Sequence, residues 1–288
     1  TFPINTEYII EWGDGTADTL DNTTFDPATP VSHTYSTFGF YDISVTVTAD
    51  GSVTCNTSTR TYTFYYGSNP AVGFNSNGNT VGLCAPATID FPISNTDNNS
   101  DGTLYEVFVN GELIDVYNHP PPPNFTFTFQ ETSCDLVTAN GLFTSAYDVR
   151  IRATNPCAST SLTVVPIEFS SPPIPMIDIA QPDLLCPDDP VVFTNATENI
   201  AEVDAGVCSA SGLTQWSLSP NDGWQVVDGS LFNSDVIEVV FDSAGVYSIT
   251  LTFNSAACGI STVTETFEIL EPAVLDSVTI EPLTTNPI

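Results

Sequence analysis

The sequence predicts an all-β protein made of three tandem β-sandwich domains, the first of them truncated at its N-terminus. Apolar and polar residues alternate with period two over many segments, and the three-and-four spacing of an amphipathic helix is never sustained. A tyrosine-led strand also recurs at intervals of about 100 residues, at 39–47, 145–153 and 244–253. Each copy must bury its own core, so the repeat indicates the number of domains.

The first copy has the fullest set of elements. In the first, a strand at 8–10 leads into the turn Trp-Gly-Asp-Gly-Thr at 12–16, and His33-Thr34-Tyr35 precedes the tyrosine-led strand. The second and third copies have strand-like runs at 107–111 and 216–219 instead. Short Pro-bearing joints then set the expected limits: domains at 1–70, 71–173 and 174–272, with 273–288 starting a following linker or domain.

The first copy resembles the PKD domain, an immunoglobulin-like β-sandwich. The turn at 12–16, then His33 and Tyr35, then Gly39 and Tyr41 stand in the order of that family's motif. The resemblance implies an immunoglobulin-like fold and a structural role for His33. The other two copies lack the Gly-Asp-Gly turn, so they resemble divergent PKD-like or immunoglobulin-like domains.

The charge balance excludes several partners. Lys and Arg total 3 against 35 Asp and Glu, for a net charge of -32. Such a surface repels nucleic acid and anionic lipid. A hydrophobic content of 41% nevertheless indicates folded domains, and no apolar run reaches the ~18 residues of a membrane span.

Cysteine placement predicts disulfides and an oxidising, extracellular location. In the second and third copies one cysteine precedes the first strand and one lies in the hairpin after the tyrosine-led strand. Nearly equal separations predict the pairs Cys84 with Cys157 and Cys186 with Cys258.

The remaining cysteines fit this scheme less directly. Cys134 and Cys208 are hypothesised to join the second and third copies, the alternative being free or differently paired thiols. Cys55 occupies the hairpin position of the first copy, so its partner is expected before that copy's first strand, outside this sequence.

No catalytic motif is present, and the chain is predicted not to be an enzyme or to require a cofactor. Calcium is the one candidate ion. Asp97, Asn99 and Asp101 have the oxygen-donor spacing of a calcium loop, although Phe108 replaces the expected Glu, and an Asx-rich turn explains the same residues. Because some PKD domains carry calcium, the resemblance adds Asp14 as a second candidate.

Three Asp-Ser/Thr-aliphatic triplets look like the O-glycosylation site of extracytoplasmic Bacteroidota proteins. The acceptors would be Thr19, Ser243 and Ser277.

The acidic, Lys-free repeats resemble the giant adhesins on the surface of gliding Bacteroidota. This resemblance implies secretion by the type IX system and display as a filament associated with the outer membrane. Partners would be neighbouring repeats, an external surface or polysaccharide, and the secretion and motility machinery. The leading hypothesis is thus a non-catalytic structural and adhesive segment. The alternative is an accessory carbohydrate- or protein-binding module of a secreted hydrolase.

Overall fold

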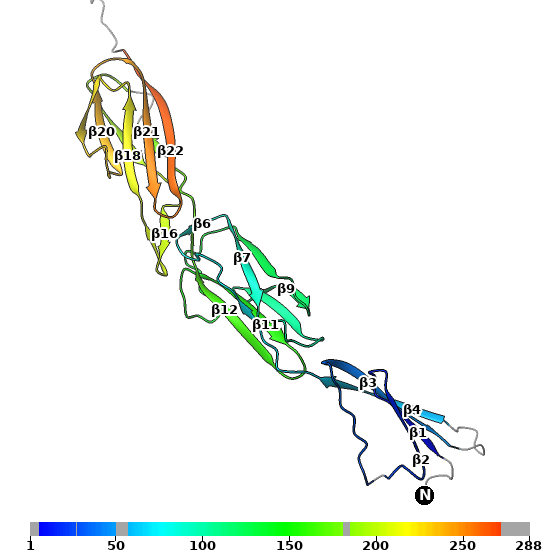
Figure 1. Cartoon of the computed structure of the whole chain (residues 1–288). Helices are drawn as coiled ribbons and strands as arrows, with labels where there is room; N and C mark the ends of the chain where they lie inside the picture. The colour runs from blue at the N-terminus through cyan, green and yellow to red at the C-terminus, as the bar shows by residue number, and fades with distance from the viewer. Residues whose placement is uncertain (1–5, 27, 50–56, 181–184, 272–288) are drawn as a thin grey trace, which may run out of the picture. The chain divides into compact units, whose positions relative to one another are not determined.

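The computed structural model describes residues 6–26, 28–49, 57–180 and 185–271 of the chain. Its elements in these ranges are strands joined by turns and loops, as Figure 1 shows. The described residues include no helix able to cross a membrane. The chain divides into two compact units: unit 1 comprises Thr1–Thr80, Thr88–Thr128 and Val137–Ile167, and unit 2 comprises Val81–Ala87, Phe129–Leu136 and Glu168–Ile288.

In unit 1 the first repeat forms one antiparallel sheet of order β2-β1-β3-β4. Its strands are β1 (Glu7–Glu11), β2 (Ala17–Asp21), β3 (Gly39–Thr48) and β4 (Thr57–Tyr66). Period-two alternation buries Tyr8 and Ile10 on one face of β1 and leaves Glu7 and Glu11 exposed on the other. The strands predicted at 8–10 and 39–47 therefore form where the sequence indicated.

The second repeat, also in unit 1, is a sandwich of two sheets with orders β10-β7-β5 and β12-β11-β8-β9. The strands are β5 (Gly73–Phe74), β7 (Ala87–Ser94), β8 (Leu104–Val109), β9 (Glu112–Asn118), β10 (Asn124–Phe129), β11 (Tyr147–Thr154) and β12 (Ser159–Ile167). Phe91 from the first sheet and Val107 and Ile151 from the second are fully buried. Burial of apolar side chains from both sheets stabilises the sandwich.

Unit 2 contains the sandwich of the third repeat, with sheet orders β14-β15-β20-β19 and β18-β21-β22. The strands are β14 (Ile177–Ile179), β15 (Pro190–Asn195), β18 (Leu213–Ser219), β19 (Trp224–Asp228), β20 (Val236–Phe241), β21 (Gly245–Ser255) and β22 (Gly259–Ile269). Trp216, Phe193 and Leu251 belong to one buried cluster that draws on both sheets.

Two short pairs of strands complete unit 2. β6 (Leu83–Cys84) runs parallel to β13 (Phe169–Ser170), and β16 (Ala201–Asp204) forms a hairpin with β17 (Val207–Ala210). The backbone N–H of Val203 donates to the side-chain oxygen of Ser170 at 3.0 Å. The hairpin is therefore tied to the segment that leaves the second repeat.

The recurring tyrosine has the same structural role in the first and third repeats. The Tyr41 hydroxyl donates to the Thr37 carbonyl at 2.6 Å, and the Tyr247 hydroxyl donates to the Ser243 carbonyl at 3.1 Å. A tyrosine near the start of a strand that bonds back to the chain a few residues earlier is the tyrosine corner of immunoglobulin-like sandwiches. The predicted all-β, immunoglobulin-like fold class is confirmed, whereas the limits 1–70, 71–173 and 174–272 stay a prediction.

Candidate functional site

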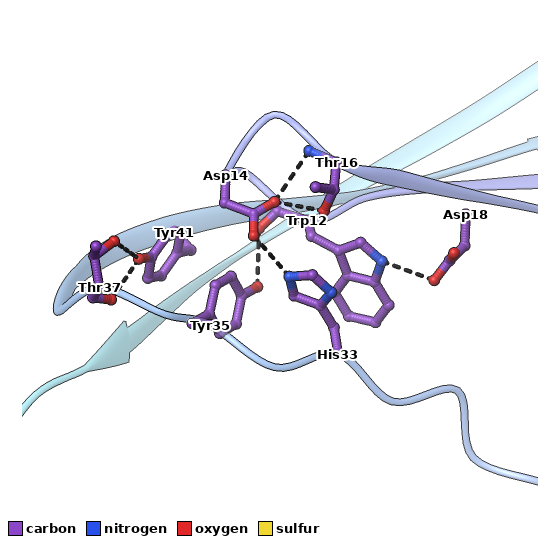
Figure 2. A network of polar contacts seen from close by, with 8 residues as sticks. All are labelled: Trp12, Asp14, Thr16, Asp18, His33, Tyr35, Thr37 and Tyr41. Carbon is purple, nitrogen blue, oxygen red and sulfur yellow. Dashed lines mark hydrogen bonds and ion pairs between the residues drawn. The ribbon is translucent and has the colours of Figure 1, made fainter.

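The turn at 12–16 is the centre of a polar network in the first repeat (Figure 2). Asp14 accepts hydrogen bonds from the Thr16 backbone N–H at 3.0 Å and from the Thr16 hydroxyl at 2.6 Å, and its other oxygen lies 2.7 Å from His33 Nε2. Gly13 has φ +82°, and a Cβ there would lie 2.9 Å from the Asp42 backbone, so this turn requires glycine.

Aromatic rings complete the network around Trp12. The indole stacks on the His33 ring at 4.8 Å between centroids, and its N–H donates to Asp18 at 2.9 Å. The Tyr35 hydroxyl donates to the Trp12 carbonyl at 2.8 Å, and the Tyr35 ring stacks on Tyr41 at 3.9 Å. The motif residues therefore hold the segment before β3 against the sheet, which is the structural role expected for His33.

Acid should weaken this network because it protonates Asp14. Hydrogen bonds from the Thr16 hydroxyl and from His33 lower the pKa of Asp14 to about 2. Because that pKa is below its unfolded value, the stabilisation is complete above about pH 4 and is lost as the pH falls toward 2. Asp14→Asn should remove this pH dependence, so its Tm difference from the wild type should shrink between pH 5 and pH 2. A difference that stays constant over that range, or that the exposed-site control Asp97→Asn reproduces, would contradict the assignment.

The predicted calcium loop has a structural function at the joint that follows the first repeat. The Asn99 side chain is 9% exposed, and its amide oxygen accepts from the Ala71 N–H at 2.8 Å. Its amide nitrogen donates to the Ala71 carbonyl and to the Tyr105 hydroxyl, both at 2.6 Å. The Tyr105 hydroxyl also lies 3.0 Å from His119 Nδ1. Asn99 thus fixes the linker to the second sandwich.

The three loop donors do not converge. Asp97 and Asp101 are exposed whereas Asn99 points into the protein, where its amide is fully hydrogen-bonded. Within the described ranges, no cluster of three or more His, Cys, Asp or Glu is placed to hold a metal ion. Calcium binding at Asp97, Asn99 and Asp101, or at Asp14, remains a prediction.

Removing the Asn99 amide should destabilise unit 1. Asn99→Ala removes the partner of the Ala71 backbone and of the buried Tyr105 hydroxyl, and a buried polar group that loses its partner typically costs about 1–3 kcal/mol. Asn98→Ala, at the adjacent exposed position, should change the free energy of unfolding by less than about 0.5 kcal/mol. Urea denaturation of both variants measures the difference, and equal effects would show that Asn99 does not hold the joint.

The structure corrects the main disulfide prediction. Cys84 bonds to Cys258, not to Cys157, and Cys186 is left as a free thiol, as is Cys157. The reason is the position of each cysteine along the sandwich. Cys84 lies beside Ser170, at the end where the chain leaves the second repeat, whereas Cys157 lies in the hairpin at the other end of β12.

The distance between those two ends excludes the predicted bonds. The 9 residues of β12 extend for roughly 30 Å at about 3.3 Å per residue, and the 11 residues of β22 extend further. Cα atoms joined by a disulfide lie less than about 7 Å apart. A cysteine that precedes the first strand of a repeat can therefore bond only to a hairpin cysteine of another repeat. Cys84 bonds in this way to Cys258, with a Cα distance of 4.9 Å.

The second disulfide is Cys134–Cys208, with Cα atoms 5.4 Å apart, and it is the pairing hypothesised from the sequence. Cys208 lies in the β16–β17 hairpin, and Cys134 belongs to the segment Phe129–Leu136 of unit 2. Cys55 lies outside the described residues.

Two of the three proposed glycosylation acceptors are accessible. Thr19 is exposed on β2, and Ser243 is exposed in the tyrosine corner of the third repeat. Ser277 lies outside the described residues. Modification of these residues remains a prediction.

Sequence reasoning missed the polar groups that support the hairpin of Cys258. The Ser255 hydroxyl donates to the buried carboxylate of Glu202, and the Cys258 N–H donates to the Ser255 oxygen at 2.9 Å. Burial raises the pKa of Glu202, but hydrogen bonds from Ser255, Ser211 and two backbone N–H groups outweigh it and lower the pKa. The sequence does contain a signal of this support, because a polar residue stands shortly before each hairpin cysteine. These residues are Asn155 before Cys157 and Ser255 before Cys258.

The chain matches no protein-family model, and it matches no curated protein. Solved structures with similar repeats include a beta-glucuronidase from glycoside hydrolase family 2 (15% identity, 76% of this chain, TM-score 0.26). Others are protocadherin gammaB7 (16% identity, 68% of this chain, TM-score 0.35) and the insect immune protein hemolin (11% identity, 94% of this chain and 72% of hemolin, TM-score 0.37).

The chain spans 23% of the length of the beta-glucuronidase and 45% of the protocadherin. At these identities and TM-scores the matches carry no information about activity, substrate or partner.

Proposed function

We propose that this chain is a non-catalytic structural and adhesive segment of an extended cell-surface protein, built from immunoglobulin-like repeats of which the first is of the PKD type. The observation that carries the proposal is the pair of long-range disulfides in unit 2. Cys84–Cys258 joins residues 174 apart in sequence, and Cys134–Cys208 joins residues 74 apart. Bonds that cross from one repeat sequence to the next limit the extension of a chain under tension.

Charge and chemistry support this proposal. A net charge of -32 keeps a long, concentrated repeat protein soluble and self-repelling. Disulfides persist outside the reducing cytosol, which favours an extracellular location. The Trp12–His33–Tyr35 network gives the PKD resemblance a structural basis in the first repeat.

A finer proposal follows the resemblance to gliding Bacteroidota adhesins. In it the segment belongs to a filament secreted by the type IX system, and its partners are neighbouring repeats, an external surface or polysaccharide and the outer-membrane motility machinery. O-glycans at Thr19 and Ser243, and calcium at Asp97 or Asp101, would be additions to the same surface.

Adhesion can be measured with beads that carry the oxidised chain and are washed under flow over glass or agarose. We expect retention above that of albumin-coated beads, and loss of retention after reduction and alkylation of the chain. Retention no better than albumin would overturn the adhesive function. Binding to a single insoluble polysaccharide that the soluble sugar competes away would replace it with a carbohydrate-binding module.

A further inference from the structure

The two free thiols of the described residues each have a bonded counterpart about 100 residues away. Cys157 and Cys258 both occupy the hairpin after the tyrosine-led strand. Cys84 and Cys186 both precede the first long strand of their repeat. One member of each pair forms the Cys84–Cys258 bond, so each free thiol can be compared with a partner position that is known.

The two hairpin cysteines have matching surroundings. Cys258 Sγ lies 3.7 Å from the Ser170 carbonyl oxygen, and Cys157 Sγ lies 3.5 Å from the Gly67 carbonyl oxygen. In each case the sulfur reaches the segment that leaves the preceding repeat. Beside Ser170 runs Leu83–Cys84, which supplies the partner of Cys258. None of the described strands pairs with Gly67, so the described residues hold no counterpart of Leu83–Cys84 beside Cys157.

The two first-strand cysteines match as well. β6 (Leu83–Cys84) runs alongside β13 (Phe169–Ser170), which leaves the second repeat. In the third repeat the Leu270 N–H donates to the Leu185 carbonyl at 2.8 Å, so residues 185–186 run alongside the segment that leaves that repeat. Cys186 is therefore at the end of its sandwich where a hairpin from a following repeat would bring a cysteine.

We propose that Cys157 and Cys186 form disulfides with neighbouring repeats of the same polypeptide, in the register of Cys84–Cys258. In this register the first-strand cysteine of one repeat bonds to the hairpin cysteine of the next. Cys157 bonds to the first-strand cysteine of the first repeat, on a strand beside Gly67. Cys186 bonds to the hairpin cysteine of a repeat that follows the third.

Partly exposed apolar side chains on β3 indicate where the strand that carries the partner of Cys157 would pack, next to Tyr8 and Ile10, which are already buried on the same face of β1. The sheet β2-β1-β3-β4 has the same order as β9-β8-β11-β12, which β10-β7-β5 covers in the second repeat. On β11, Val149, Ile151 and Ala153 are 0% exposed, whereas Ile43, Val45 and Val47 at the matching positions of β3 are partly exposed. On β4, Tyr62 lies opposite Ile43 and is 59% exposed, and Arg60 lies opposite Val45.

The covering sheet and the missing cysteine belong to the same segment. In the second repeat, Cys84 lies directly before β7, the central strand of the covering sheet. The strands that would cover Ile43, Val45 and Val47 would therefore carry the cysteine that reaches Cys157. Two separate observations, the Cys157 thiol without a disulfide partner and the partly exposed side chains of Ile43, Val45 and Val47, indicate the same occupant.

The chemistry of the bond is ordinary thiol–disulfide exchange. Two thiols each lose one proton and one electron as the S–S bond forms. These pass to the disulfide of a thiol–disulfide oxidoreductase, which is reduced to a dithiol. No group in the described residues has to act as the oxidant.

The register has a mechanical consequence that deepens the proposed function. Each bond encloses a loop that overlaps the loop of the next bond. Under tension, the force would pass through the bond of Cys157, along the short stretch 157–186, and then through the bond of Cys186. A filament of such repeats would resist extension even with unfolded sandwiches, whatever surface it binds.

Peptide mapping of the native, unreduced polypeptide from its source cells tests the register. Pepsin digestion at low pH is suitable, because thiols are protonated there and exchange stops. We expect the peptides that contain Cys157 and Cys186 to be linked to cysteine peptides from outside residues 1–288. An alkylated free Cys157 or Cys186, or a bond from either to a cysteine within residues 1–288, would overturn the proposal. Adhesion does not enter this measurement, so its failure is distinguishable from failure of the proposed function.

A matched variant tests the register within the chain itself. In Cys258→Ser, Cys84 loses its partner, and we expect it to remain alkylatable while Cys134–Cys208 stays intact. Formation of a Cys84–Cys157 bond in this variant would show that bonds within one repeat are accessible, and it would contradict the register.

Discussion

Trp216→Ala is expected to lower the free energy of unfolding of the third repeat by about 3–5 kcal/mol, the usual cost of removing a large buried aromatic side chain. Trp216 is 1% exposed and packs in the cluster with Phe193 and Leu251. Its indole N–H donates to the Ser234 carbonyl at 2.8 Å. The substitution therefore creates a cavity and also removes a hydrogen bond.

Chemical denaturation followed by circular dichroism measures this loss, and hydrogen exchange in β20 and β21 assigns it to the third repeat. Leu213→Ala is the matched control, because Leu213 is on the same strand and 60% exposed. It should change stability by less than about 0.5 kcal/mol. A loss below about 1 kcal/mol for Trp216→Ala would mean that the two sheets do not share this core.

Removing the Cys84–Cys258 bond should have a comparable effect on unit 2. The bond closes a loop of 174 residues, of which Cys134–Cys208 already closes 74. About 100 residues thus gain freedom in the unfolded chain, which corresponds to about 4–5 kcal/mol on the chain-entropy model. The double variant Cys84→Ser/Cys258→Ser should show this loss in urea denaturation.

Cys157→Ser is the control for that double variant, because it removes a thiol that is free in this chain. It should leave the free energy of unfolding within about 0.5 kcal/mol of the wild type. If the double variant is no less stable than this control, the bond does not constrain the unfolded chain.

The fold class was predictable because it rests on local signals. Strand alternation at 8–10 and 39–47 and the tyrosine near the start of β3 and β21 are properties of short segments. The structural role of His33 was predictable for the same reason. Trp12, His33 and Tyr35 lie within one repeat, and they occur in the order of the motif that the first repeat resembles.

Disulfide pairing was not predictable in the same way. In a repeat of constant length, Cys84 has a hairpin cysteine at a regular spacing both in its own repeat and in the next. Spacing alone cannot choose between Cys157 and Cys258. The choice depends on which end of the sandwich each cysteine occupies, and the pairing of β6 with β13 sets that position.

The inward direction of the Asn99 side chain was not predictable for a related reason. Letters at 97–102 show oxygen donors at alternate positions but not the direction in which each side chain points. The Asn99 amide turns inward because the Ala71 backbone and the Tyr105 hydroxyl need partners there. A joint between repeats and an ion-binding loop can share the same short polar sequence.

Single-molecule stretching of the chain from its two ends tests most directly whether the disulfides limit extension. In the oxidised chain, the residues between Cys84 and Cys258 cannot extend, since force passes through the bond. Reduction should release these 174 residues and lengthen the fully unfolded chain by about 600 Å, at about 3.6 Å per residue. Equal contour lengths before and after reduction would contradict a structural segment braced by bonds between its repeats.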